Sequence, residues 1–422
     1  MSSASTGPRS QGWLWTLVVA GFFSQTALNL VRPVTTYKLI DLGADATAVG
    51  LVTAAYAILP VVSAMWLGRL TDRIPGLRVM VGIGALVLAA GAAALALAGT
   101  IVWVAAASAV LGMGHLIFTI AGQSAIARFS PNDQLDRGFG WFTAAYAGGQ
   151  IAGPLVAGLL LGDGAGIGPG TRAEGTTFSM WLGAALALTV LPVLLPGIIA
   201  SRGGTRGRGT APGERRRRAV LSAPAPQDDG GPGRPTMGAI LNRPGVRSNM
   251  LASLALLAML DILTAFLPLV GEAHGVSPAW IGMLLAARGA GTIISRGFLP
   301  YLSRRIARRI LLMGSLYGAG ICLAVPALVI DTPWATLVLL FAGGIFLGLG
   351  QPLTMSLISE SVPHSWRGSA LAVRLMGNRL GQVVMPLAAG LIAAPLGPAG
   401  AIWFGCAVLV GSGVQKSLGP AR

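Results

Sequence analysis

The sequence predicts an all-α integral membrane protein, with twelve transmembrane helices in two pseudo-symmetric six-helix bundles. Hydrophobic residues make up 54% of the 422 residues and charged residues only 10%, which excludes an ordinary soluble domain. Apolar runs long enough to cross about 30 Å of hydrocarbon occur as six, then a polar interval, then six more. Glycine motifs of the first half recur in the second half, which indicates two copies of one unit.

The apolar runs divide the chain into five regions. We expect an N-terminal tail at 1–12, a bundle at 13–200, a basic disordered linker at 201–247, a second bundle at 248–414 and a tail at 415–422. The linker is rich in Gly, Pro and Arg, a composition typical of disorder. The expected spans are 13–36, 47–67, 79–98, 101–127, 138–161, 177–199, 248–270, 278–299, 309–330, 334–358, 369–392 and 397–414.

Basic residues predict the orientation of the chain. On the side of the N-terminus, the tails, loops and linker hold 24 of the 30 Lys and Arg residues. By the positive-inside rule, both termini and the linker are expected in the cytoplasm, with the protein in the plasma membrane. This distribution also explains the net charge of +16, so we expect no nucleic-acid partner.

The fifth span contains small residues at four-residue spacing. Its pattern runs through Gly140, Gly149, Gly153, Pro154 and Gly158. Small residues on one helix face let a neighbouring backbone approach closely, and Pro154 should kink the helix. The run from Gly149 to Gly158 recurs 232 residues later, from Gly381 to Gly390.

The loop between the second and third spans carries an acid beside several basic residues. Its motif comprises Gly68, Asp72, Arg73 and Arg78. Asp72 lies near the expected start of the third span, where a carboxylate complements the helix dipole. A charged turn that merely obeys the positive-inside rule is the alternative interpretation.

Together these motifs resemble those of the major facilitator superfamily, in particular its drug/proton antiporter branches. The resemblance implies the major facilitator fold, a cytoplasmic gate at the loop motif and the antiporter motif in the fifth span. Two positions depart from the pattern: Ala157 replaces a common glycine, and Ser108 lies where proton antiporters usually carry an arginine. The second departure weakens the case for the usual proton-coupling arrangement.

Polar residues form helical stripes inside several spans. Such groups are costly in hydrocarbon and usually face a cavity or a partner. In the resembled family, the first, fourth, seventh and tenth helices line the cavity, and all four carry stripes here. The substrate-cavity candidates are Gln25, Asn29, Arg32, His115, Thr119, Gln123, Gln351, Arg374, Asn378, Arg379 and Gln382, although some could instead form helix–helix hydrogen bonds.

Asp261 is the candidate proton carrier. It alone among the fourteen acids lies well inside an expected span, about 21 Å from the cytoplasmic end. Arg288 is expected at a similar depth, so we predict an Asp261–Arg288 pair. Making and breaking this pair would couple protonation to conformation, whereas a permanent pair would only hold two helices together.

The sequence therefore predicts a secondary transporter that exports a small organic compound, in exchange for protons, and that acts as a monomer. The alternative is a facilitator or importer of a small, anionic metabolite. A membrane enzyme or sensor is disfavoured, because no nucleophile–base set, metal-ligand spacing or soluble signalling domain occurs. No cofactor and no metal are expected, since Cys322 and Cys406 both lie within apolar spans.

Overall fold

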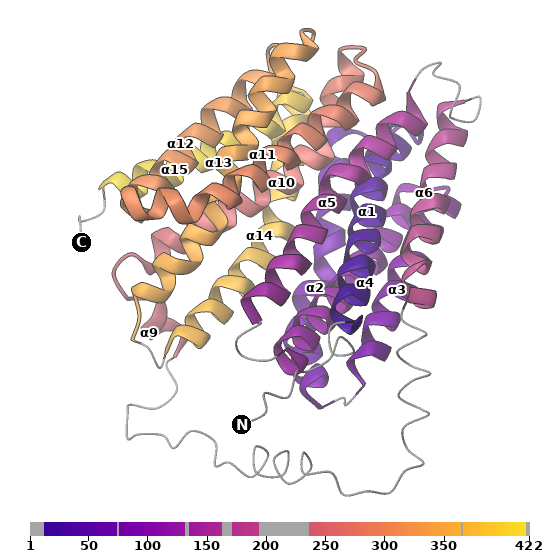
Figure 1. The fold of residues 1–422 in the computed structure, drawn as a ribbon. Helices are drawn as coiled ribbons and strands as arrows, with labels where there is room; N and C mark the ends of the chain where they lie inside the picture. Colours follow the sequence, from indigo (N-terminus) through magenta and orange to yellow (C-terminus); the bar gives the residue numbers. More distant parts are fainter. Residues whose placement is uncertain are drawn as a thin grey trace, which may run out of the picture.

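The structure, a computed structural model, describes residues 12–73, 76–130, 135–162, 171–193, 236–363 and 366–418. Twelve long helices within these ranges form two groups of six (Figure 1). The N-terminal bundle contains α1 (Gly12–Asp41), α2 (Ala46–Arg73), α3 (Leu77–Leu97), α4 (Ile101–Phe129), α5 (Leu135–Leu161) and α6 (Arg172–Leu188). The C-terminal bundle contains α10 (Val246–Ala273), α11 (Pro278–Arg305), α12 (Arg308–Ala324), α13 (Pro333–Glu360), α14 (Arg367–Leu396) and α15 (Pro398–Leu418). A 3₁₀ turn, η4 (Val325–Ala327), extends α12.

Eleven of the described helices are long and apolar enough to cross a membrane, which makes the chain a multi-pass membrane protein. The twelfth long helix, α11, is less apolar and contains four arginines, at 288, 296, 304 and 305. The predicted all-α fold class is confirmed. The sixth helix begins five residues before the expected span at 177, because Thr171 and Glu174 form a capping box at its start.

The molecule has two ends, which we define by the helix termini they hold. The linker face is where α1 begins and α9 (Met237–Leu241) lies, and the opposite face is where α1 ends and α6 begins (Figure 1). The prediction of disorder through residue 247 is wrong from Thr236 onward. There Thr236 caps α9, and Ile240 is buried against Val246, Ile358 and Val362. Residues 201–235 lie outside the described part of the chain.

The glycines of α5 place two different helices in close contact. A Cβ on Gly149 would lie 2.5 Å from Cβ of Gln25, and one on Gly153 would lie 2.6 Å from the Asn29 carbonyl carbon, both in α1. A Cβ on Gly158 would instead lie 2.9 Å from the Pro278 carbonyl oxygen, in α11 of the other bundle. The contacts of α5 with α1 and with α11 therefore both require glycine, because a side chain would keep the helices apart.

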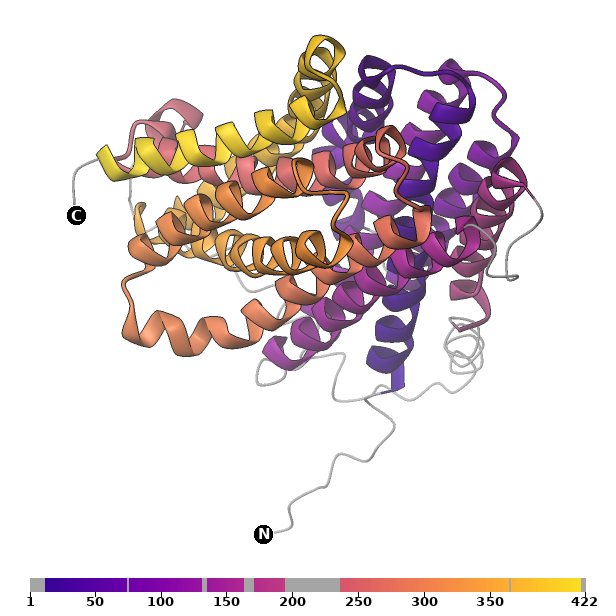
Figure 2. The same cartoon turned by 90° about the horizontal axis from the view of Figure 1, so that it is seen from above.

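The two bundles lie side by side in Figure 2, and two glycine crossings related by the internal duplication join them. A Cβ on Gly282 of α11 would lie 2.3 Å from the Pro154 carbonyl oxygen and 2.9 Å from Cα of Gly158. A Cβ on Gly50 of α2 would lie 2.5 Å from the Pro386 carbonyl oxygen and 2.9 Å from Cα of Gly390. The helix ends at these crossings all belong to the opposite face, so the bundles are closed against each other there.

Candidate functional site

An ion pair joins the two bundles at the centre of the molecule. Arg32 Nη2 of α1 donates to Asp261 Oδ1 of α10 over 2.6 Å, and the two side chains are only 17% and 6% exposed. Gln382 Nε2 of α14 donates to Asp261 Oδ2 over 2.9 Å. Arg379 Nη1 in turn donates to Gln382 Oε1 over 2.9 Å. The carboxylate is therefore held from both bundles at once.

A second group of polar contacts continues from Arg32 into the N-terminal bundle. The Arg32 guanidinium lies 4.8 Å from the centre of the Tyr56 ring, a cation–π geometry. Asn29 Nδ2 donates to Gln25 Oε1 over 3.3 Å, which turns the Gln25 amide nitrogen toward His115 Nε2 at 3.0 Å. His115 Nε2 then accepts, so a neutral imidazole carries its proton on Nδ1 and donates it to Tyr56 Oη over 2.6 Å.

Of the remaining α4 candidates, Thr119 reaches this network only indirectly, through Tyr146, which also forms a hydrogen bond with Gln25. The hydroxyls of Thr119 and Tyr146 share a hydrogen bond of 3.1 Å. Gln123, one turn further along α4, is exposed. The polar stripe predicted on α4 therefore joins the central network directly through His115.

The C-terminal candidates form a separate polar contact within their own bundle. Arg374 Nη2 donates to Gln351 Oε1 over 2.7 Å and to Thr354 Oγ1 over 3.2 Å. Gln351 Nε2 donates to the Ser253 carbonyl oxygen over 3.0 Å. Asn378, on the same helix as Arg374, is buried, and its Oδ1 has no hydrogen-bond partner. These residues connect α10, α13 and α14.

The predicted Asp261–Arg288 pair is wrong, because Asp261 pairs with Arg32. Arg288 lies near enough to Asp261 for electrostatic attraction, but Arg32 of the other bundle makes the direct ion pair. The Arg288 side chain is 5% exposed, and its Nε lacks a hydrogen-bond partner. Its backbone carbonyl oxygen lies against Gly344 of α13.

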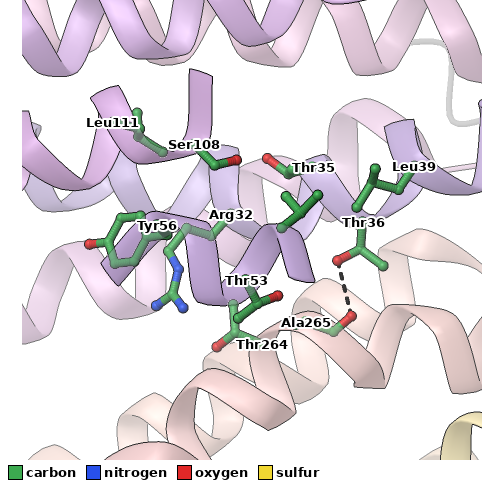
Figure 3. A pocket seen from close by; sticks show the side chains of 11 residues that line it. Arg32, Thr35, Thr36, Leu39, Thr53, Tyr56, Ser108, Leu111, Thr264 and Ala265 are labelled. Carbon is green, nitrogen blue, oxygen red and sulfur yellow. Dashed lines mark hydrogen bonds between the residues drawn. The ribbon is translucent and has the colours of Figure 1, made fainter. Parts of the chain in front are cut away.

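A small cavity adjoins the central ion pair on the side of the opposite face (Figure 3). Arg32, Tyr56 and hydroxyl side chains from α1, α2, α4 and α10 line it, and Thr36 Oγ1 donates to the Ala265 carbonyl oxygen over 3.0 Å. Its volume is about 30 Å³. A site of that size holds water and is far below the ~300 Å³ that organic ligands require.

A second inter-bundle contact lies at the opposite face. Arg172 at the start of α6 donates to Asp41 of α1 over 2.7 Å and to Glu272 of α10 over 2.5 Å. Arg172 and Asp41 belong to one bundle and Glu272 to the other. This cluster, which we name the Arg172 clamp, adds charge attraction to the glycine crossings.

Comparison with known proteins decides the family. The family model described as Major Facilitator Superfamily matches residues 17–269 and 249–418. The chain belongs to the major facilitator superfamily. Superfamily members are transporters, in agreement with the predicted membrane fold.

Individual relatives match only part of this chain. The tetracycline resistance protein, class E, of Escherichia coli is 31% identical over 147 residues, 33% of this chain and 34% of that protein. The multidrug resistance protein MdtG of Yersinia enterocolitica is 29% identical over 174 residues, 39% of this chain and 42% of that protein. A crystal structure of a D-xylose–proton symporter has a TM-score of 0.71 at 15% identity, covering 98% of each chain, and shows the shared fold.

The superfamily motifs are only partly within the described residues. The surroundings of Gly68 and the side chains of Asp72 and Arg73 lie outside them, so the cytoplasmic gate stays a prediction. Arg78 lies in the first turn of α3. Gly140 is exposed, and a Cβ there would meet no atom within 4 Å, so this glycine makes no close crossing.

Several contacting residues of this superfamily member escaped the sequence analysis. Arg172 fell in a predicted loop, although the Thr171–Glu174 capping pattern marks a helix start there. Gly50 and Gly282 are separated by the same 232 residues as the recognised repeats, and that offset was the available signal. No cluster of three or more potential metal ligands occurs in the described ranges.

Proposed function

We propose that this chain exports a small organic compound across the plasma membrane by alternating access, in exchange for protons, and that it acts as a monomer. Superfamily membership makes it a transporter. The direction is supported by its partial similarity to two resistance proteins. Because those matches span about a third to two fifths of the relatives, substrate and direction are inferred here.

The basic residues support an orientation with the linker face in the cytoplasm. In that orientation, the glycine crossings and the Arg172 clamp close the outer side of the transporter. Export would then start from this conformation, with substrate entering between the bundles from the cytoplasm. Release outside would require Gly50 and Gly282 to move away from α14 and α5.

The observation that carries the proposal is the position of Asp261 between the bundles. Its carboxylate accepts hydrogen bonds from Arg32 of the N-terminal bundle and from Gln382 of the C-terminal bundle. A proton on Asp261 would remove the charge that attracts Arg32, and so weaken a link between the bundles. Loss of the proton would restore the link, which couples protonation to the relative position of the bundles.

Replacing Asp261 by Asn tests this coupling. We expect Asp261→Asn to abolish uphill transport driven by a pH gradient in inverted vesicles, while exchange down a substrate gradient continues. Asp331→Asn, a change at an exposed loop acid, is the matched control and should transport normally. If the Asp261→Asn protein still concentrates substrate with the pH gradient, Asp261 is not the proton carrier.

The second candidate function is import or facilitated passage of an anionic metabolite. Arg32, Arg288, Arg374 and Arg379 all lie within long helices of the described residues, and of these four only Arg32 forms an ion pair with Asp261. The Nε atoms of Arg288 and Arg374 are buried and have no hydrogen-bond partner. Donors of this kind are expected in an anion-binding site that holds no anion. Under this alternative, Arg379→Gln should reduce transport of anionic compounds selectively, and an equal loss for cationic compounds would exclude it.

A further inference from the structure

A large cavity at the linker face of the C-terminal bundle has no part in the proposed transport cycle. It lies between α9, the start of α10 and the ends of α13 and α15, far along these helices from the central ion pair. Its volume is about 870 Å³, within the range of small-molecule sites. Four basic residues lie in its lining, together with polar residues and with Leu241, Pro244 and Leu357.

Among the described residues, the cavity lining carries more positive than negative charges. Arg243, Arg247, Arg309 and Lys416 are its cations, and Glu360 is its acid. Glu360 already forms an ion pair with Arg308 of α12. A cavity with this excess of positive charge favours an anionic ligand.

Lys416 shows the need for an anion most directly. The residue is 8% exposed, and its Nζ donates over 2.6 Å to Oδ1 of Asn249, a neutral group. Arg309 Nη2 lies close by and donates to the Lys416 carbonyl oxygen over 2.9 Å. Among the described residues, no acid contacts this ammonium, and a bound anion would supply the counter-charge that a buried cation requires.

The backbone adds further attraction for an anion. Gly245, with φ +81°, precedes the 28-residue helix α10, and no side chain caps that helix start. Gly245, Arg247 and Ser248 all line the cavity. The positive end of the α10 dipole is thus directed at the same space as the four cations.

Exposed apolar side chains occur on α9, α12 and α15, the helices that also contribute residues to the cavity lining. Met237 of α9, Ile310 beside Arg309, and Leu418 beside the α15 end are 52%, 57% and 81% exposed. Exposed apolar groups beside basic ones are typical of the boundary between hydrocarbon and headgroups. This combination favours a membrane lipid over a soluble ligand.

We propose that this cavity binds the phosphate group of an anionic phospholipid from the leaflet at the linker face. The cations and the α10 N-terminus hold the phosphate, and the acyl chains lie along the exposed apolar side chains of these helices. Basic pockets between membrane helices on the cytoplasmic side recognise such headgroups. The site is independent of Asp261 and of the direction of transport.

The test measures binding of fluorescent phosphatidylglycerol to the full-length protein in detergent, with phosphatidylcholine and inorganic phosphate as competitors. In the Arg243→Gln/Arg247→Gln double variant, affinity should fall about thirtyfold, from roughly fivefold for each basic residue near an anionic headgroup. The matched control is Arg304→Gln/Arg305→Gln, the same charge change at exposed residues outside the cavity lining. The control should keep the affinity of the unaltered protein.

The competitors separate the possible ligands. Preference for phosphatidylglycerol over phosphatidylcholine, lost only in the cavity variant, supports the proposal. Inorganic phosphate that displaces the lipid probe at low concentration would identify a soluble phosphate ligand and overturn the lipid assignment. Equal binding of both lipids, or full affinity in the cavity variant, would overturn the site itself. If the Gln variant unfolds at a lower temperature without lipid, Arg243→Lys/Arg247→Lys, which keeps the charge, should retain the binding.

Discussion

Gly282 is a position at which one methyl group should change the balance between conformations and leave the folding of each bundle intact. The Cβ of an alanine there would lie 2.3 Å from the Pro154 carbonyl oxygen and 2.9 Å from Cα of Gly158. Both atoms belong to the other bundle. The collision therefore exists only while the bundles are closed at the opposite face.

The size of the effect follows from these distances. Ordinary contact begins near 3.4 Å, so the backbones must separate by about 1 Å. Overpacking of this kind costs about 1–3 kcal/mol, which corresponds to roughly a 5- to 150-fold shift toward the state open at the opposite face. The helix-propensity gain of alanine over glycine is present in both conformations and cancels.

The assay is the distance distribution between spin labels at Leu97→Cys and Ala273→Cys, near the opposite face of the two bundles. Cys322 and Cys406 are first replaced by alanine. Gly282→Ala should enrich the longer distances, and Gly50→Ala, at the duplicated crossing, should do the same. Protein without these glycine changes provides the reference distribution.

Two other glycines of α11 are matched controls. A Cβ on Gly297 would meet no atom within 4 Å, so Gly297→Ala should change nothing. A Cβ on Gly291 would lie 2.2 Å from the Phe341 carbonyl oxygen of the same bundle, so Gly291→Ala should lower stability without altering the distances. An unchanged distribution in Gly282→Ala, or equal shifts in all three variants, would refute the reasoning.

Three further changes test other parts of the molecule. Gly153→Leu should abolish transport or folding, because its side chain would separate α5 from the Asn29 backbone of α1, and normal uptake in vesicles would contradict that packing. Arg172→Gln should favour the state open at the opposite face by about 1.4- to fivefold, since only its ion pair with Glu272 crosses between the bundles and such exposed pairs contribute roughly 0.2–1 kcal/mol. High salt should mimic this change in the spin-label assay. Asp72→Asn should slow turnover and leave the apparent substrate affinity largely intact, as expected of a gate. A large affinity loss at unchanged turnover would assign Asp72 to the binding site instead.

The number and order of the helices could be predicted because hydrocarbon imposes a simple requirement. Each crossing needs a long apolar run, and such runs are visible without knowledge of any partner. Asp261 could be recognised as a candidate functional residue for the same reason, since a carboxylate is rare in such an apolar run. The helix ends were predictable only to within about two turns, since α2 and α11 continue to Arg73 and Arg305, beyond the expected span ends at 67 and 299.

Which side chains of different helices contact each other was less predictable. Arg288 was chosen for Asp261 by depth, yet Arg32 of the other bundle lies opposite the carboxylate. Periodicity shows which residues share a face of one helix, but it does not show which helix that face meets. Gly158 illustrates the same limit: its spacing continues the Gly149–Gly153 groove, whereas its neighbour is α11 and not α1.

The paired glycine crossings also determine how far a small rotation reaches. Gly50 and Gly282 lie within the first turns of helices that each contain 28 residues. Each helix is about 42 Å long, so a tilt of roughly 10° about its crossing moves its other end by about 6 Å. Bare backbone at the pivots permits this tilt without the withdrawal of any interlocked side chain. The helix start lies about 6 Å from the crossing, so a shift of only about 1 Å at the opposite face accompanies the displacement of about 6 Å at the linker face.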